Sequence, residues 1–148
     1  MKKPSKGLPQ PKWINIEDFE FICFNATREL LELNEPIPEY STRDNSLLES
    51  SLAAPRQAFE FAKAPLERQA SVLFYSLIKN HPFKNGNKRI AVVTLLIFLS
   101  LNKKWLEINP LFLYEIAVLV AKSDPKERDT ILKENTELLK KSIVEPKA

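Results

Sequence analysis

Hydrophobic residues recur at three- and four-residue intervals over most of this chain, a spacing that is typical of amphipathic helices. The first such segment begins at Asn15, a residue type that caps helices well, and the two prolines within residues 34–38 end it. Its expected buried face comprises Phe19, Ile22, Cys23, Ala26, Leu30 and Leu33. Another segment begins at Pro65 and ends near Asn80, with the buried face Leu66, Ala70, Leu73, Phe74, Leu77 and Ile78.

The most apolar stretch of the chain runs from Ile90 to Leu101. A helix that is apolar on every side belongs inside a fold, so this stretch is the predicted central helix. Two later helices begin with a capping residue followed by proline. Asn109-Pro110 precedes a helix over 111–121, and Asp124-Pro125 precedes one over 126–143.

Between the first segment and the one at Pro65, the sequence predicts a shorter helix. Ser46 and Glu49 match a capping box, in which a hydroxyl and a carboxylate satisfy each other's backbone N–H groups. We expect this helix over 47–54, ending at the proline that follows, with an irregular or weakly helical crossover over 56–64. The only plausible extended piece is 103–108. The pattern therefore predicts an all-α, single-domain fold of about six helices around a central buried helix.

Composition narrows the class of protein. A chain of 148 residues can bury a sizeable core, and 44% hydrophobic with 28% charged residues is ordinary for a globular protein. The net charge of +3 falls short of a nucleic-acid-binding footprint. No run approaches the roughly 18 apolar residues of a membrane span. The single cysteine, Cys23, cannot form an internal disulfide, so we expect a core residue in a reducing, cytoplasmic environment.

A polar stretch that contains a glycine, residues 81–89, lies between the helix that ends near Asn80 and the central apolar helix. It holds the chain's only histidine. The first N–H groups of a helix have no partner within the helix, and the dipole places partial positive charge there. Gly86 allows close approach of a ligand to the backbone, while Lys88 and Arg89 add full charges. These residue types favour a phosphate-binding helix start. His81, five residues before the glycine, can accept a proton from an attacking hydroxyl.

The same residues also fit a simpler interpretation. A histidine before a proline is common in turns, and Gly-Asn is a common turn pair. Lys84, Lys88 and Arg89 can equally form a solvated rim. The residue types alone therefore leave anion binding, catalysis and a plain turn all open.

The stretch from His81 to Arg89 resembles the active-site signature of the Fic/Doc family. That signature is His-x-Phe-x-(Asp/Glu)-(Gly/Ala)-Asn, followed by Gly-Arg in Fic-type members and by Lys-Arg in Doc-type members. Further similarity lies in Arg43-Asp44-x-x-Leu47-Leu48-Glu49-Ser50-x-Leu52-Ala53-x-Pro55, in Leu77 to Phe83, and in Phe98-Leu99-x-Leu101-Asn102. The resemblance implies the helical Fic fold and divides the chain into a flexible lead over 1–12, a Fic/Doc domain over 13–124, and a C-terminal helix and tail over 125–148.

The resemblance also implies roles for individual residues. His81 would act as the base toward a target hydroxyl, and Lys88 and Arg89 would complete the catalytic set by neutralising phosphate charge. ATP is the implied cofactor. Its expected binding residues are Phe83, Asn85, Gly86, Asn87, Lys88 and Arg89. Phe83 is expected at the same time to anchor the loop in the core.

Asn85 departs from the family pattern, because members usually carry aspartate or glutamate there as a Mg²⁺ ligand. An amide oxygen can coordinate a hard cation but brings no charge. We therefore expect Asn85 to be a weak ligand for Mg²⁺ that arrives with the nucleotide, and metal affinity to fall.

Two further segments are assigned through the resemblance. The flap that docks the target would be Tyr40, Ser41, Thr42, Arg43 and Asp44, the alternative being a plain connector with an Arg43–Asp44 ion pair. Residues 130–135 match the inhibitory-helix pattern of some Fic members, with Glu134 as its glutamate. The arginine that should pair with Glu134 is replaced by Val92, so we interpret the match as ordinary helix surface and expect silencing in trans.

Fic enzymes commonly move AMP from ATP onto a protein, whereas Doc-like toxins phosphorylate a translation elongation factor and are silenced by an antitoxin. Lys88 places this chain on the Doc side. The expected function is that of a Doc-like toxin of a toxin–antitoxin pair, which transfers phosphate from ATP to a hydroxyl of a target protein. AMP transfer, and a catalytically attenuated protein that only binds nucleotide or partner, stay open as alternatives. Nucleic acid and membrane are not expected partners.

Overall fold

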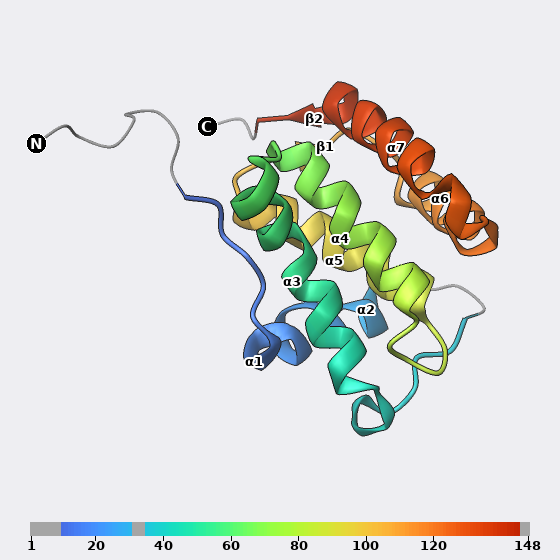
Figure 1. The fold of residues 1–148 in the computed structure, drawn as a ribbon. Helices are drawn as coiled ribbons and strands as arrows, with labels where there is room; N and C mark the ends of the chain where they lie inside the picture. The colour runs from blue at the N-terminus through green and yellow to red at the C-terminus, as the bar shows by residue number, and fades with distance from the viewer. Residues whose placement is uncertain (1–9, 31–34, 146–148) are drawn as a thin grey trace, which may run out of the picture.

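A computed structural model describes residues 10–30 and 35–145, which form six helices and a small two-stranded sheet at one edge of the fold (Figure 1). The first helix joins α1 (Ile16–Phe19), the π-helical turn η1 (Glu20–Phe24) and α2 (Asn25–Glu29). The other elements are η2 (Tyr40–Thr42), α3 (Asn45–Ala62), α4 (Leu66–Asn80), α5 (Asn87–Leu101), β1 (Trp105–Leu106), α6 (Pro110–Lys122), η3 (Pro125–Glu127), α7 (Arg128–Ser142) and β2 (Ile143–Val144). The predicted all-α class is confirmed.

Helix α5 lies at the centre of the fold, as its apolar composition predicts. It packs against α4, α6 and η1, while α3 and α7 cover α4 (Figure 1). The predicted face of α4 is buried apart from the half-buried Leu66, although Pro65 is the N-cap rather than the first helical residue. Within the described part of the chain, no helix combines the length and the apolar character needed to cross a membrane.

The first helix buries only part of the predicted face: Phe19 and Cys23 are fully buried and Ala26 is half-buried, as predicted, but the rest differs. Ile22 and Leu30 are 36% and 54% exposed, Phe24 is fully buried, and Leu33 lies outside the described residues. The cause is η1, because i→i+5 hydrogen bonding adds a residue to one turn and rotates the following face. A uniform 3.6-residue period cannot anticipate that rotation.

Cys23 lies in the core, as predicted, with no measurable exposure. Burial raises the pKa of its thiol to about 12, against a smaller lowering effect of a hydrogen bond with Thr94. Because the thiolate is the reactive form, the thiol is inert at neutral pH.

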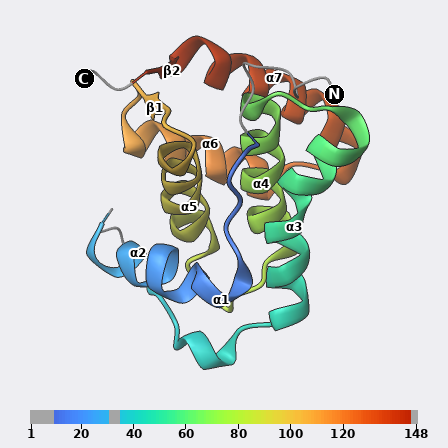
Figure 2. The ribbon, with the colours of Figure 1, turned by 90° about the vertical axis from the view of Figure 1, so that its left-hand side faces the viewer.

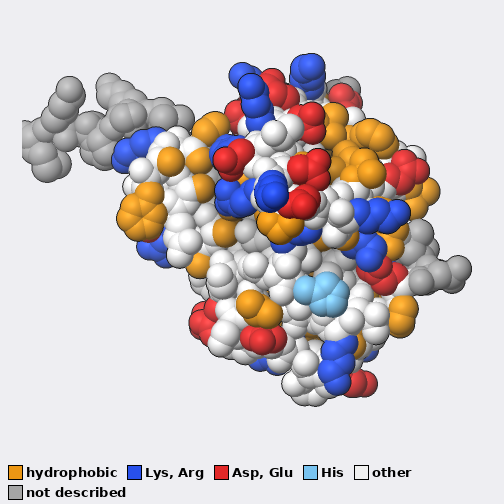
Figure 3. Space-filling view, turned by 45° about the vertical axis from the view of Figure 1, so that its right-hand side comes forward, with side chains coloured by type: hydrophobic (Ala, Val, Ile, Leu, Met, Phe, Trp, Pro, Cys, Tyr) orange, Lys and Arg blue, Asp and Glu red, His pale blue; other side chains and the backbone are white. Residues whose placement is uncertain are grey.

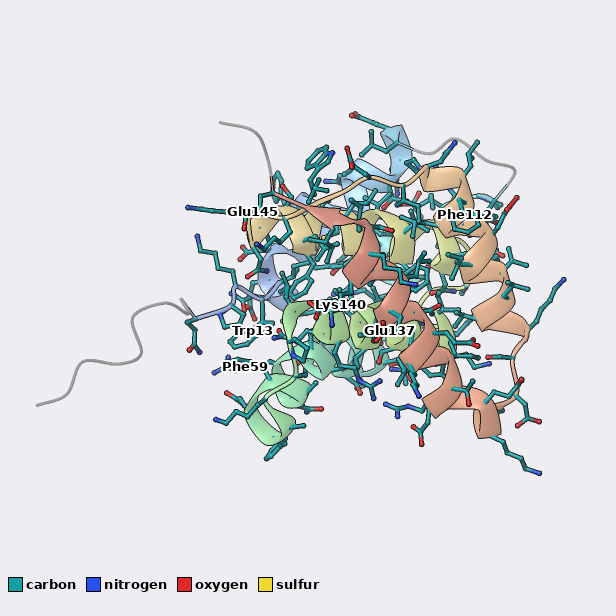
Figure 4. All side chains as sticks on the ribbon, turned by 90° about the horizontal axis from the view of Figure 1, so that it is seen from above. Trp13, Phe59, Phe112, Glu137, Lys140 and Glu145 are labelled. Carbon is teal, nitrogen blue, oxygen red and sulfur yellow. The ribbon has the colours of Figure 1, made fainter. Side chains whose placement is uncertain are left out.

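The predicted end of the shorter helix at Pro55 is wrong, because α3 continues through the proline to Ala62. Proline has no N–H, so the helix loses one internal hydrogen bond at this position. Pro55 and Leu52 are buried, and Phe59, one turn later, packs against Trp13 with ring centroids 5.7 Å apart and ring planes tilted by 54° (Figure 4). Packing on both sides of the proline outweighs the lost bond, and the helix ends only at Lys63, which has a φ of 54°.

The predicted capping box at the start of α3 is also wrong. The N-cap is Asp44, whose carboxylate accepts the N–H of Leu47 at 3.0 Å. The backbone N–H of Asp44 itself donates to the carbonyl of Pro82 at 2.8 Å. This long-range bond fixes the start of the helix two residues before Ser46, so Glu49 has no reciprocal role with that serine.

The two termini of the described chain are held by the C-terminal end of α5 and the segment after it. Lys12 exchanges two backbone hydrogen bonds with the side chain of Asn102, at 2.8 and 2.9 Å. The segment before α1 runs alongside α4 and α5 (Figure 2). The predicted extended piece contains β1, which pairs antiparallel with β2. Because of this pairing the last helix ends at Ser142, one residue short of the predicted limit, and the following strand was not predicted.

Two phenylalanine substitutions test the central position of α5. Phe98 is fully buried on α5, whereas Phe61 on α3 is 86% exposed. We expect Phe98→Ala to lower the free energy of unfolding by about 3–5 kcal/mol, through lost burial and the cavity that remains. The matched control Phe61→Ala should change it by less than about 0.5 kcal/mol. Urea unfolding followed by circular dichroism measures both changes. Equal effects of the two substitutions would contradict the central, buried position of α5.

Candidate functional site

A tight loop joins α4 to α5 and carries the predicted site. His81 is the C-cap of α4, with a left-handed φ of 53°, and Gly86 is the N-cap of α5, with a φ of 80°. His81 is exposed on the molecular surface (Figure 3). The loop therefore places an accessible imidazole and the N-terminus of a buried helix at its two ends.

The side chain of Asn87 braces this loop from inside. Its Oδ1 accepts the backbone N–H of Phe83 at 3.0 Å, and its Nδ2 donates to the carbonyl of Phe83 at 2.8 Å. Asn87 is only 5% exposed. Phe83 is 2% exposed and stacks on Phe24 with centroids 5.3 Å apart, so its predicted anchoring role is confirmed. Both side chains hold the loop, and a ligand outside the loop meets backbone rather than these groups.

Gly86 is required by a close approach as well as by its backbone angle. A Cβ at this position would lie 2.7 Å from Cδ1 of Ile37 and 3.1 Å from the carbonyl oxygen of Pro36. The segment Glu35-Pro36-Ile37, which we name the covering segment, therefore lies directly against the start of α5.

The carboxylate of Glu35, in the covering segment, contacts two residues of the predicted anion-binding site, Lys88 and Arg89. One carboxylate oxygen accepts from Lys88 Nζ and from the Tyr114 hydroxyl, each at 2.9 Å. The other oxygen accepts the backbone N–H of Arg89 at 3.3 Å. No pattern in the sequence indicates this role, because a glutamate beside two prolines is typical of a helix end.

The contacts around Glu35 shift the pKa values of two groups, the Glu35 carboxyl and the Tyr114 hydroxyl. Burial alone would raise the pKa of Glu35, but hydrogen bonds from Lys88, Tyr114 and the backbone of Arg89 outweigh it, and the pKa lies below its ordinary value. Burial, together with the bond to Glu35, raises the pKa of Tyr114 to about 12. Glu35 is therefore an ionised carboxylate at neutral pH, held by a neutral phenol and a cation.

Arg89 points toward the first helix. Its guanidinium donates to the carbonyls of Glu35 at 2.6 Å, Thr27 at 2.8 Å and Leu30 at 3.4 Å. Arg89 is 6% exposed, and its Nε finds no acceptor among the residues that the structure describes. A cation at the carbonyl end of α2 suits the helix dipole, so this side chain fastens α2 and the covering segment to α5.

The predicted flap lies beside His81. Its turn η2 is followed by Asp44, which is bonded to Pro82, the neighbour of His81. Arg43 lies over the ring of Tyr40, 3.9 Å from its centroid, and donates to the Tyr40 carbonyl at 3.0 Å. The alternative interpretation of an Arg43–Asp44 ion pair is not what the structure shows, since the other bond of Arg43 goes to Asn45. Ser41 and Thr42 are exposed.

The described part of the chain does not form a Mg²⁺ site of its own. Asn85 is exposed and offers one neutral oxygen. No cluster of three or more His, Cys, Asp or Glu side chains suited to a metal occurs in residues 10–30 and 35–145. Glu134, the candidate inhibitory glutamate, is exposed on α7, a helix that packs mainly on α4 (Figure 4).

Comparison with known families identifies the domain. The family model described as Fic/DOC family matches residues 15–99, more than half of the 148-residue chain. The chain belongs to the Fic/DOC family. Its helical fold is that of a Fic domain, and members of this family are generally transferases that modify proteins and use nucleotides as substrates. No curated protein and no solved structure matches the chain.

Two asparagine substitutions test the bracing of the loop. Asn87→Ala would leave the buried N–H and carbonyl of Phe83 without partners. We expect the free energy of unfolding to fall by roughly 2–6 kcal/mol, since each of the two orphaned groups costs about 1–3 kcal/mol. The matched control Asn85→Ala, at an exposed position of the same loop, should change it by less than about 0.5 kcal/mol. Chemical unfolding measures both, and a neutral Asn87→Ala would rule out the bracing role.

Proposed function

We propose that this Fic/DOC protein transfers the γ-phosphate of ATP to a hydroxyl of a target protein. The observation that carries the proposal is the loop itself. It joins an accessible His81 to the N-terminus of α5, within a Fic domain and beside a flap that is bonded to Pro82. A helix N-terminus with Lys88 on its first turn suits phosphate, and an imidazole suits proton abstraction from a hydroxyl.

The reaction follows from these groups. His81 accepts the proton of the target hydroxyl as the hydroxyl oxygen forms a bond to the γ-phosphorus. The bond from that phosphorus to the bridging oxygen breaks, and ADP leaves with the electron pair. The N–H groups at the start of α5 and the Lys88 ammonium would stabilise the negative charge on the phosphates. Mg²⁺ ordinarily accompanies ATP, and no step here relies on a metal held by the protein.

Lys88 is the reason for proposing phosphate rather than AMP transfer. It occupies the position of the second glycine in AMP-transferring members, where its side chain adds bulk and charge. A different pose of the nucleotide is expected at such a site. The Doc-like reading extends to the partners, and we propose a translation factor as target and an antitoxin that silences the enzyme in trans.

An attenuated nucleotide-binding protein is the second candidate. Asn85 favours it, since a neutral ligand replaces the acidic one at an exposed position. Glu35 favours it as well, because its carboxylate is bound to Lys88.

Labelled ATP tests the reaction. With a lysate of growing cells, we expect label from the γ position, and not from the α position, to appear on a protein. His81→Ala should lower the rate by about 100- to 10,000-fold, the usual contribution of a general base. The control Lys122→Ala changes an exposed residue at the end of α6 and should leave the rate unchanged. Transfer of the α label would establish AMP transfer instead, and transfer of neither label would reject the enzyme.

Asn85→Asp tests the metal position. One added carboxylate should lower the Mg²⁺ concentration needed for half-maximal ATP binding by roughly tenfold, about 1.4 kcal/mol. Isothermal titration over a Mg²⁺ series measures this binding independently of turnover. The control Asn25→Asp adds the same charge at an exposed residue of α2 and should have no effect. An unchanged Mg²⁺ dependence for Asn85→Asp would remove this residue from the nucleotide site.

A further inference from the structure

The covering segment brings a carboxylate to the place where a phosphate is expected. Glu35 accepts from two donors at the start of α5, the Lys88 ammonium and the backbone N–H of Arg89, and from the hydroxyl of Tyr114 on α6. A phosphate oxygen at this helix start would use the same ammonium and the same N–H. The Glu35 carboxylate and such an anion therefore compete for these donors.

The backbone of the covering segment is held as firmly as the carboxylate. The carbonyl of Glu35 accepts from the Arg89 guanidinium at 2.6 Å. Ile37 packs on Gly86 so closely that a Cβ there would lie 2.7 Å from its Cδ1. A ligand that approaches the backbone at Gly86 meets this segment first.

The ion pair between Glu35 and Lys88 is also shielded from water. The side chain of Glu35 is 13% exposed and that of Lys88 is 30% exposed. An ion pair at such a position is screened less than one on an open surface.

We propose that Glu35 is an internal anion that closes the phosphate-binding start of α5, and that the phosphates of a nucleotide must displace it. The proposal rests on the nucleotide-dependent function proposed above. In the closed form, Lys88 is paired and the backbone at Gly86 is covered. In the open form, the covering segment moves away and both become available.

This arrangement differs from the inhibitory helix considered for Glu134. Glu134 is exposed on α7, whereas Glu35 contacts the first turn of α5 directly. A closed site lowers the apparent affinity for ligand by the fraction of molecules that are open. Any change that weakens the hold on Glu35 should therefore tighten ligand binding.

The test compares the Kd of ATP and of inorganic tripolyphosphate, by isothermal titration without added metal. Glu35→Gln keeps the shape of the side chain and an acceptor for Tyr114 but removes the charge. We expect it to bind both ligands about tenfold more tightly than wild type, the factor for a closed form that outnumbers the open form by about ten to one. The matched control Glu39→Gln makes the same charge change at an exposed residue four positions along, and should bind as wild type does.

A second variant grades the effect. Tyr114→Phe removes one hydrogen bond to Glu35 and leaves both charges in place. We expect a smaller tightening, about threefold, since a neutral hydrogen bond contributes less than the charge. Circular dichroism and thermal unfolding establish that each variant is folded.

The outcomes separate this proposal from the function it rests on. If Glu35→Gln binds tripolyphosphate no more tightly than wild type, Glu35 is a structural brace and the closing role is overturned. If it tightens tripolyphosphate while no variant binds ATP, the closing role stands and ATP is the wrong ligand. If no variant binds either ligand, the anion site and the nucleotide-dependent function both fail.

Discussion

The buried helix α5 begins with backbone N–H groups that no residue of the same helix can accept. A helix of this kind cannot be placed in a core unless its polar start reaches the surface or meets an acceptor. The fold uses both solutions. Asn87 turns its side chain back to Phe83 and closes the preceding loop, and Glu35 accepts the N–H of Arg89. The loop, the covering segment and the position of His81 all follow from this junction.

The same junction separates two cations that the sequence places side by side. Lys88 and Arg89 differ by one position, so their side chains leave the helix about 100° apart. Arg89 goes inward to the carbonyl end of α2, while Lys88 goes to the carboxylate of Glu35. Arginine suits the inward role, because its flat fork satisfies several carbonyls at once. Of the two, Lys88 is the better placed to meet an anion that replaces Glu35.

The sequence predicts well those features that depend on neighbouring residues. Asn109 caps α6 through the N–H of Leu111, and Asp124 caps the last helical segment, both as expected. The features that were missed depend on distant contacts. The bond from Asp44 to Pro82 decides where α3 begins, and packing around Pro55 carries that helix past a proline. Glu35 meets Lys88 across 53 positions of chain, which no local pattern reveals.

Asn85 and Glu35 affect the same site in different ways. A neutral amide at position 85 is a fixed property of the chain, and it lowers the attraction for a divalent cation in every state. Glu35 is held by noncovalent bonds, so under our proposal its effect depends on what competes for Lys88 and the start of α5. A ligand that carries several negative charges competes best, because it can engage the ammonium and the helix start together. A polyphosphate should therefore displace Glu35 more readily than a single phosphate does. A site for a nucleoside triphosphate requires this preference.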